Sequence, residues 1–528
     1  MEKIAFGTGG LRGIMGDEHG NINDKVIQWA TFGFVKVVLS SDAPKSVGIA
    51  YDTRHNSAEF ARVASDTFSA FGIDVYVFDK PMPTPILSFA IRHLKLGWGV
   101  CITASHNPQE YNGYKVYDEH GVQVTDCLAM KITDSINSIG AGESVPEVRK
   151  ELIKSFDSEV VEAYLEQIVS FVIAGSPCRT DWTRNPVSYA HYPGDCGSEA
   201  AMTSNLKTIY SALHGAGANA VPVVLERLGF SPVCIQQNPD GAFGGLKTPN
   251  PEEPVVYKKA LEKAKETGAK MILTTDPDCD RVGVMVKTED GFELLNGNQI
   301  GALLIDYLAQ TRGVVKGNTV ISTIVSGLLG ELVAKEHGLE FVRLLTGFKY
   351  IGEYIVNLPD DKQFFFGYEE SYGYLAGGGP KDKDAVIASA LIVQMAEHYD
   401  VKGMTLLDRW VELSEKHGYC LESLHSVNIP QAKQKEIMSR LRSVNSFDGV
   451  TRTEDYIHGI NGLPPADVLK LCFTDIDGSP TTEAWAAIRP SGTEPKLKLY
   501  IGVRARTYET ARTALDLLKT KLVKELEV

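Results

Sequence analysis

The chain has 528 residues, of which 43% are hydrophobic and 23% charged, and its formal net charge is −14. This length predicts three to five domains of roughly 100 to 200 residues each, and the composition excludes a disordered or fibrous protein. Because a nucleic-acid binder needs a basic stripe that displaces counterions, the acidic balance also disfavours nucleic acid as a partner.

The first residues form no apolar stretch of the kind that a secretory signal needs, and no run reaches the roughly 20 apolar residues of a membrane span. The eight cysteines are dispersed and contain no CxxC pair, which argues against a zinc module or a disulfide framework. We therefore expect a soluble, cytoplasmic protein with reduced thiols and no membrane partner.

Apolar runs and helical stretches alternate from residue 46 onward, with a strand, a helix and a strand predicted at 47–50, 58–71 and 73–78. The alternation recurs twice, at 209–213, 220–228 and 271–275, and at 319–325, 328–337 and 341–345. Such alternation favours parallel sheets, so three α/β domains in series are predicted. Beyond residue 405 strands and helices mix and end in an amphipathic helix over 508–526, which predicts a fourth, α+β domain.

One stretch, 175–205, is rich in Pro, Gly, Ser and Asn, and we interpret it as a linker or surface insertion between the first two domains. The predicted domains are 1–200, 201–300, 301–410 and 411–528. Two nucleotide motifs are excluded. The glycine-rich start, GTGGLR at 7–12, fails the GxGxxG pattern at its last position, and the chain has no Gly-Lys dipeptide for a P-loop.

A serine and a histidine follow the apolar run 98–102 in the segment TASHNP at 103–108. Ser105 is placed on a strand-to-loop turn, where a hydroxyl is exposed for nucleophilic attack, and His106 beside it could move or steady a proton. Ordinary turn chemistry is the alternative that this dipeptide alone leaves open.

Three aspartates in DPDCDR follow the predicted strand 271–275. In extended backbone alternate residues face the same way, so Asp276, Asp278 and Asp280 are expected to converge at the end of that strand. Their hard oxygens suit Mg²⁺ and leave room for a phosphoryl oxygen. A calcium-binding EF-hand is rejected, because Arg281 and Lys287 stand where it needs Gly and Glu.

Two later loops carry groups suited to a phosphorylated sugar. GYEESYG at 367–373 combines carboxylates, a hydroxyl and aromatic rings, which can read sugar hydroxyls and cover a sugar face. RPSGTEPK at 489–496 offers a guanidinium, hydroxyls and loop amides to a phosphate dianion. Loop packing for the first and an ordinary Pro/Gly turn for the second remain equally open on these residues alone.

The order of the motifs along nearly the whole chain is far more specific than any one of them. FGTGGLRG (6–13), TASHNP, YNGYK (111–115), DPDCDR, TGFKYIG (346–352), GYEESYG and RPSGTEPK together resemble the α-D-phosphohexomutases, the superfamily of phosphoglucomutases and phosphomannomutases. The resemblance implies an α/β fold of four domains: three similar mixed α/β sheet domains and a C-terminal α+β domain of the TATA-binding-protein-like type, around a central cleft.

The same resemblance implies a role for each matching residue. Ser105 would be carried as phosphoserine and complete one Mg²⁺ shell with the three aspartates, Asp276, Asp278 and Asp280. The groups flanking the transferred phosphoryl would be Arg12, His106, Lys115 and Arg281. Lys383 matches a proposed general acid/base, a role for which His106 and Lys115 are rivals. Sugar hydroxyls would contact Glu369, Ser371, Thr346 and Gly347. The phosphate that is not transferred would contact Arg489, Ser491, Gly492 and Thr493.

The activity implied is that of a phosphoglucomutase, an isomerase that interconverts glucose 1-phosphate and glucose 6-phosphate through phosphoserine and glucose 1,6-bisphosphate. The Glu-Glu-Ser order of the sugar loop favours glucose, whereas TGFKYIG also occurs in the branch that contains phosphopentomutase. Phosphomannomutase and phosphopentomutase therefore stay alternatives on the same scaffold. From other classes, a metal-dependent phosphatase and a non-catalytic sugar-phosphate-binding protein are the competing hypotheses.

Overall fold

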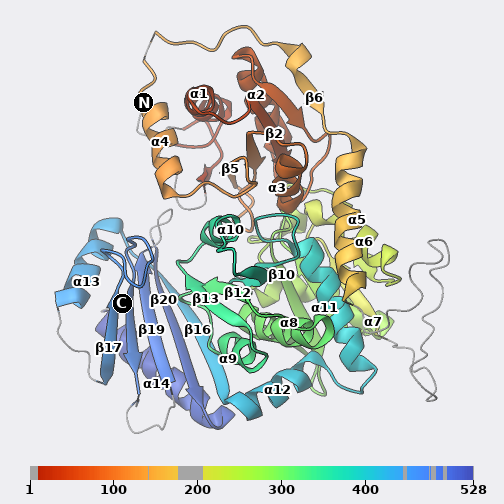
Figure 1. The fold of residues 1–528 in the computed structure, drawn as a ribbon, viewed down its shortest axis with the longest axis vertical. Helices are drawn as coiled ribbons and strands as arrows, with labels where there is room; N and C mark the ends of the chain where they lie inside the picture. The colour runs from red at the N-terminus through yellow and green to blue at the C-terminus, as the bar shows by residue number, and fades with distance from the viewer. Residues whose placement is uncertain are drawn as a thin grey trace.

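Four β-sheets follow one another along the chain, each with its own helices (Figure 1). The structure is a computed structural model, and it describes residues 10–18, 20–140, 142–175, 206–443, 449–474, 476, 483–490 and 496–526. Most of the predicted insertion, 176–205, lies outside the described residues. Among the described helices, none combines the length and apolar character of a bilayer span.

The first sheet has the strand order β1-β5-β4-β2-β3-β6. β2 pairs in parallel with β3 and β4, while β5 runs antiparallel to both of its neighbours. Its strands are β1 (Leu11–Ile14), β2 (Ser46–Tyr51), β3 (Asp74–Val77), β4 (Trp98–Ile102), β5 (Tyr111–Tyr117) and β6 (Ile153–Ser155). Its helices are α1 (Asp24–Ser40), α2 (Ser57–Ala70), α3 (Thr84–His93) and α4 (Asp126–Asn137). The antiparallel connection from β4 to β5 therefore forms the loop that carries Ser105.

The second and third sheets are also mixed, with a parallel centre and antiparallel strands at one side. The second has β7 (Thr208–Ser211), β8 (Val233–Ile235), β9 (Met271–Thr275), β10 (Val282–Lys287) and β11 (Phe292–Leu295), with α6 (Val221–Arg227) and α7 (Lys258–Thr267). The third has β12 (Asn318–Thr323), β13 (Glu340–Leu344), β14 (Gln363–Tyr368) and β15 (Tyr374–Ala376). Its helices are α8 (Gly297–Arg312), α9 (Leu329–Glu336), α10 (Phe348–Val356), α11 (Ala385–Asp400) and α12 (Leu406–His417).

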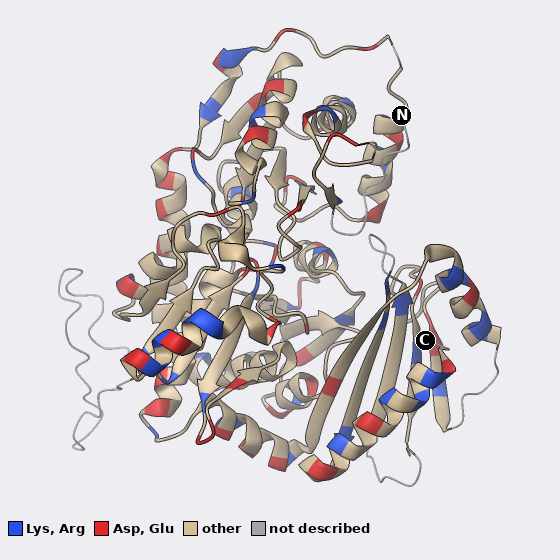
Figure 2. Cartoon of the chain, turned by 180° about the vertical axis from the view of Figure 1, so that it is seen from behind, with Lys and Arg blue, Asp and Glu red and all other residues tan. Residues whose placement is uncertain are grey.

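The fourth sheet is wholly antiparallel, in the order β16-β20-β19-β18-β17. Its strands are β16 (Tyr419–Asn428), β17 (Val450–Asp455), β18 (Leu469–Phe473), β19 (Glu483–Pro490) and β20 (Lys496–Ala505). The helices α13 (Gln431–Ser443) and α14 (Tyr508–Glu525) complete it. α14 buries Ala511, Leu515 and Leu518, while acidic and basic residues alternate along its outer side (Figure 2). This amphipathic helix is the one that the sequence predicted.

One large core joins the first three sheets. Tyr164, Tyr210 and Tyr368 come from three different parts of the chain, are fully buried, and belong to the same hydrophobic cluster. α5 (Ser158–Ala174) contributes to this union, because it packs on α3 of the first sheet and also on α6 and α11 (Figure 1). The hydroxyl of Tyr164 on α5 donates to Asp384 Oδ1 at the start of α11, 2.9 Å away. The fourth sheet has a cluster of its own.

The predicted elements agree with the structure to within a few residues at each end, and β9 begins and ends where its strand was predicted. The mixed α/β fold with a fourth, β-rich unit is confirmed. The boundaries at 200, 300 and 410 remain predictions. The packing of α5 against α6 and α11 was not predicted, because nothing in its amphipathic pattern says which neighbours cover its apolar side.

Candidate active site

Ser105 lies in the loop between β4 and β5, and its backbone is held in an unusual conformation. Its φ of 51° is in the left-handed region, which a non-glycine residue adopts rarely. The Ser105 amide donates to Thr103 Oγ1 at 2.8 Å. In this position the Ser105 hydroxyl donates to Asp276 Oδ2 at 2.7 Å and lies 3.2 Å from His106 Nδ1. The serine and the first aspartate, 171 residues apart, are therefore in direct contact.

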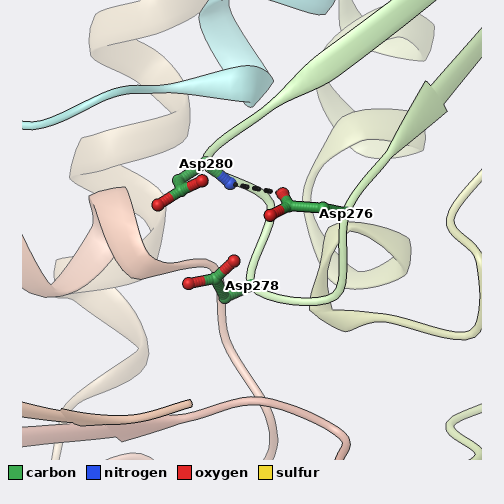
Figure 3. A group of neighbouring side chains, drawn as sticks. All are labelled: Asp276, Asp278 and Asp280. Carbon is green, nitrogen blue, oxygen red and sulfur yellow. Dashed lines mark hydrogen bonds between the residues drawn. The ribbon is translucent and has the colours of Figure 1, made fainter. Parts of the chain in front are cut away.

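The three aspartates converge in the turn between β9 and β10 (Figure 3). Each offers a carboxylate oxygen, and these oxygens lie within 4.8 Å of one another. The expectation of convergence is met, but not by strand alternation: β9 ends at Thr275, and Cys279 turns the chain with a φ of 54°. Asp276 Oδ1 accepts hydrogen bonds from the amides of Asp280 and Arg281, at 3.1 and 3.0 Å. The tight turn thus orients its own first carboxylate.

The triad has the features of a site for a hard cation. All three side chains are buried, and Asp278 Oδ1 and Asp280 Oδ1 are buried without a hydrogen-bond partner among the described residues. Burial, and then the charges of Asp278 and Asp280, raise the pKa of Asp276 well above its ordinary value. Like charges this close repel unless a cation neutralises them, and carboxylate oxygens suit divalent metals. The chain's own donor set therefore fits a metal ion.

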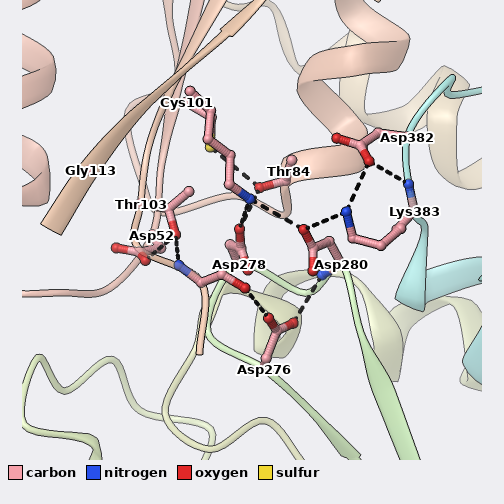
Figure 4. Close-up of polar contacts among 12 residues, drawn as sticks. Asp52, Thr84, Cys101, Thr103, Gly113, Asp276, Asp278, Asp280, Asp382 and Lys383 are labelled. Atoms are coloured by element: carbon pink, nitrogen blue, oxygen red, sulfur yellow. Dashed lines mark hydrogen bonds and ion pairs between the residues drawn. The ribbon is translucent and has the colours of Figure 1, made fainter. Parts of the chain in front are cut away.

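Two buried lysines flank the triad. Lys115 Nζ, on β5, lies 2.7 Å from Asp278 Oδ2 and 3.2 Å from Asp280 Oδ2. Lys383 lies between Asp280 and Asp382, with distances of 3.3 and 3.2 Å (Figure 4). Burial opposes the charge of both lysines, but the nearby carboxylates outweigh it and raise the pKa of each. Both lysines are therefore cations held against the acidic cluster.

His106 is close enough to both arginines assigned to the transferred group, Arg12 and Arg281, to be affected by their charges. Burial, followed by the charges of Arg281 and Arg12, lowers the pKa of His106 well below its ordinary value, so that the ring is neutral. Arg12 Nη1 donates to Asn107 Oδ1 at 3.0 Å, next to the serine. Arg281 Nη1 donates to Glu252 Oε1 at 2.9 Å. Glu252, on a loop of the second sheet, was not singled out from the sequence, because no local pattern places it there.

A cavity of about 1070 Å³ connects these groups with the sugar loop. Of the predicted site residues, its lining includes Arg12, Ser105, His106, Lys115, Asp280, Arg281, Thr346, Gly347, Glu369, Ser371, Lys383 and Arg489. Asp276 and Asp278 lie behind Ser105 and Lys115, which they contact. Glu369 Oε1 accepts a hydrogen bond from the Gly347 amide at 2.8 Å. This bond joins the sugar loop to the loop that carries Thr346 and Gly347, 22 residues earlier in the chain. Burial raises the pKa of Glu369.

The fourth sheet contributes a row of polar side chains to the same cavity. Arg489 on β19 and Lys498 on β20 are register partners, and Lys498 also pairs with Ser426 on β16. All three line the cavity. Ser491, Gly492 and Thr493, like residues 6–9 of the first motif, lie outside the described residues. Lys498 was missed from the sequence, although its spacing from Lys496 places both on one face of a strand, which is a signal that could have found it.

The fold and the cavity together define a class of protein: a multidomain α/β enzyme whose cleft has an acidic, serine-bearing end and a basic end. Comparison with known proteins gives the family. Residues 3–143, 188–291 and 296–413 match the families described as phosphoglucomutase/phosphomannomutase, alpha/beta/alpha domains I, II and III. The chain therefore belongs to the phosphoglucomutase/phosphomannomutase family.

Relatives in sequence and in structure agree with this assignment. The chain is 34% identical over 530 residues to the phosphoglucomutase of Staphylococcus epidermidis, a match that covers 95% of this chain and 90% of the relative. The putative phosphomannomutase of Thermus thermophilus has a similar fold, with a TM-score of 0.72 and 22% identity over 99% of both chains. The N-acetylphosphoglucosamine mutase of Aspergillus fumigatus, solved with GlcNAc-6P and magnesium, has a TM-score of 0.52 and 14% identity over 99% and 96% of the two chains. These two structures are evidence for the fold alone.

Proposed function

We propose that this protein is a phosphoglucomutase, which interconverts glucose 1-phosphate and glucose 6-phosphate. The observation that carries the proposal is the contact of the Ser105 hydroxyl with the Asp276 carboxylate, at 2.7 Å, in a cavity that also holds the Arg489–Lys498 pair. A nucleophile at one end and a separate basic site at the other suit a substrate with two phosphorylation positions. The curated relative at 34% identity supports the same activity.

Mg²⁺ is the cation that we assign to the triad. Asp276, Asp278 and Asp280 would hold it together with an oxygen of Ser105. The buried Oδ1 atoms of Asp278 and Asp280, which accept no hydrogen bond among the described residues, support this assignment. The bound ion would neutralise charge on the phosphoryl oxygens. The magnesium complex of the Aspergillus relative is consistent with this choice of metal.

The protein's own groups account for the transfer step. Ser105, carried as phosphoserine, loses its phosphoryl group as the Oγ–P bond breaks and a new bond forms from phosphorus to the hydroxyl of a glucose monophosphate. Arg12 and Arg281 line the cavity beside Ser105 and would bind the phosphoryl oxygens. The hydroxyl proton passes to His106, Lys115 or Lys383, which remain rivals, and Ser105 Oγ takes up a proton as its bond to phosphorus breaks. The ring of His106 is neutral and contacts the serine oxygen, whereas each lysine is a cation and must first give its own proton to that oxygen before it can accept one. The product of this half-reaction is glucose 1,6-bisphosphate.

The second half-reaction requires the bisphosphate to turn over, so that its other phosphate faces Ser105. We assign the distal phosphate in both orientations to Arg489 and Lys498, with Ser491, Gly492 and Thr493 of the adjoining loop. Glu369 and Ser371, with Thr346 and Gly347, would bind the sugar hydroxyls. A site that reads hydroxyls and a terminal phosphate separately can accept both orientations of the same ring, which is what the reaction needs.

Glucose is the sugar that we propose, and mannose and pentose phosphates are the alternatives within the family. The described cysteines are free of disulfides, which supports our assignment of the protein to the cytoplasm.

A single experiment ranks the candidate substrates by their rates of conversion. The protein, loaded with Mg²⁺ and a trace of glucose 1,6-bisphosphate, is offered the 1-phosphates of glucose, mannose, glucosamine and ribose together, and products are followed by ³¹P NMR.

Preferential conversion of the glucose ester is the expected result. A preference for mannose or ribose would contradict the substrate assignment and leave the phosphoryl-transfer mechanism standing, whereas release of inorganic phosphate without isomerisation would indicate a phosphatase. The Ser105→Ala variant, treated identically, is the control for contaminating mutase.

A further inference from the structure

Arg54 is a buried arginine that the reaction described above does not use. It follows β2, its side chain is fully buried, and it does not line the active-site cavity. Its guanidinium donates to four backbone carbonyls of the loop that carries the serine: Nη2 to Ser105 and Asn107, and Nη1 to Pro108 at 2.7 Å and Tyr111 at 3.1 Å. One side chain therefore holds the loop on both sides of its turn.

A second chain of contacts connects Arg54 to the backbone amide of the same serine. Asp52 lies 3.3 Å from Arg54 Nε. It accepts a hydrogen bond from Thr103 Oγ1 at 2.6 Å (Figure 4). The Thr103 hydroxyl oxygen in turn accepts a hydrogen bond from the Ser105 amide at 2.8 Å. The Asp52 side chain also accepts from Ser57 Oγ at 2.7 Å. The carbonyl and the amide of Ser105 are thus both bonded to one buried network, which begins in the turn after β2.

The conformation that this network holds is unfavourable for a serine. The φ of Ser105 is 51°, and a non-glycine residue leaves the left-handed region unless its surroundings fix it there. That conformation is the one in which the Ser105 hydroxyl reaches Asp276. Arg54 also stacks on the ring of Phe243 from the second sheet, 5.0 Å from its centroid. The network therefore links the serine loop to the unit that supplies the aspartates.

We propose that Arg54 is a positioning residue for phosphoryl transfer: its planar fork keeps Ser105 in the left-handed conformation that aims the hydroxyl at the aspartate triad. This inference rests on the proposed function. It attributes the effect to the geometry of the fork and not to the positive charge, because five donors in one plane can bond several carbonyls at once and an ammonium group cannot do so from the same place.

Two substitutions separate geometry from charge. Arg54→Lys keeps the charge and loses the fork, and Arg54→Met loses both. Arg92→Met is the control, because Arg92 also donates to loop carbonyls, those of Gly378 and Gly379, but it is an exposed residue of α3 outside the serine loop. Turnover of glucose 1-phosphate is measured for each protein. The occupancy of phosphoserine is measured by mass spectrometry of the intact protein, and the folded fraction is measured by thermal unfolding.

Both Arg54 variants are expected to lose about a hundredfold in kcat, the usual cost of a misplaced reacting group. KM should stay within about threefold of its original value, because a group that acts only on the transfer step lowers kcat and kcat/KM together. Phosphoserine occupancy after treatment with glucose 1,6-bisphosphate should fall in both. Arg92→Met should match the unmodified enzyme in kcat, in KM and in phosphoserine occupancy.

Several results would overturn the inference: full activity in Arg54→Lys, a rise in KM with kcat unchanged, or an equal loss in Arg92→Met. If the Arg54 variants do not fold, Thr103→Val decides, since it breaks only the contacts to the Ser105 amide and should give the same loss of kcat at constant KM. Unmodified protein that converts no hexose phosphate would instead refute the proposed function, so the two failures are distinguishable.

Discussion

The two ends of the active-site cavity differ in how their charges are balanced. At the acidic end the carboxylates of three aspartates already contact Lys115, Lys383 and Ser105, and nearly every group is buried. At the basic end Arg489 and Lys498 lie side by side, and within the described part of the chain neither has an ion-pair partner. The comparison teaches that the acidic end balances its charges largely within the chain, whereas the proposed function would have the basic end balanced by a phosphate of the substrate.

Removing the nucleophile tests the acidic end most severely. Ser105→Ala should reduce sustained turnover by about 10³-fold or more, because no other described hydroxyl is bonded to Asp276, and a loss of that size corresponds to about 4 kcal/mol of transition-state stabilisation. The measurement is steady-state conversion of glucose 1-phosphate. The exposed Ser158→Ala is the control. Ordinary turnover in Ser105→Ala would contradict the central role given to this serine.

Weakening the cation site should have the next largest effect. Asp278→Asn removes one carboxylate from the triad and leaves Lys115 with one fewer anionic partner, so kcat should fall by about 10²-fold or more and the Mg²⁺ needed for half-maximal activity should rise. A magnesium titration of activity checks both. The exposed Asp290→Asn should change neither, and an unaltered magnesium dependence in Asp278→Asn would count against the assigned ligands.

Removing a charge from the basic end should act mainly on binding. A hydrogen bond to a charged group is worth about 1.5–3 kcal/mol, so Arg489→Ala should raise KM by about 10- to 100-fold with a smaller change in kcat. Lys498→Ala is expected to behave alike, because it lines the cavity beside Arg489. Arg512→Ala, on the outer side of α14, is the control. If KM stayed constant in both variants, the phosphate would have to bind elsewhere.

The smallest expected effect concerns stability next to the acidic end. Burial raises the pKa of Asp384 from 3.8 to about 6, although the amides of α11 and the Tyr164 hydroxyl counteract it. Between about pH 4 and 6 the unfolded chain ionises while the folded protein keeps the proton, so the free energy of unfolding should fall as pH rises, by roughly 3 kcal/mol at most.

Asp384→Asn should remove this dependence of the unfolding free energy on pH. It should keep the cap of α11, since Asn also caps helices well. Denaturant unfolding at a series of pH values measures the change, with the exposed Asp360→Asn as control. A slope that persists unchanged in Asp384→Asn would show that another group is responsible.

The sequence predicted the acidic end better than the basic one, for a physical reason. DPDCDR and TASHNP are local patterns that each follow a strand, so both loops could be found from the sequence. Their contact with one another could not, because β4 and β9 belong to different sheets. The way in which the aspartates converge does not follow, because it depends on the left-handed turn at Cys279. Glu252 reaches the cavity through the packing of whole sheets, which no short pattern describes, whereas the spacing of Lys498 from Lys496 was a usable signal that the sequence analysis did not take up.

Arg54 illustrates the same limit. In sequence it is a charged residue in a polar turn, and only the folded chain shows that the carbonyls of Ser105 and Asn107 meet at its guanidinium.

The division of the hydrophobic core has a consequence for how the molecule comes apart. Side chains from the first three sheets interlock in one cluster, so these sheets are expected to lose their structure together. The fourth sheet packs its own cluster with α13 and α14. It meets the third through a smaller group that includes Ile324 and Trp485, and through Cys420 at the start of β16, which belongs to the large cluster. On heating, two cooperative units should therefore be distinguishable, and a ligand that bridges the cavity should draw the two melting temperatures together.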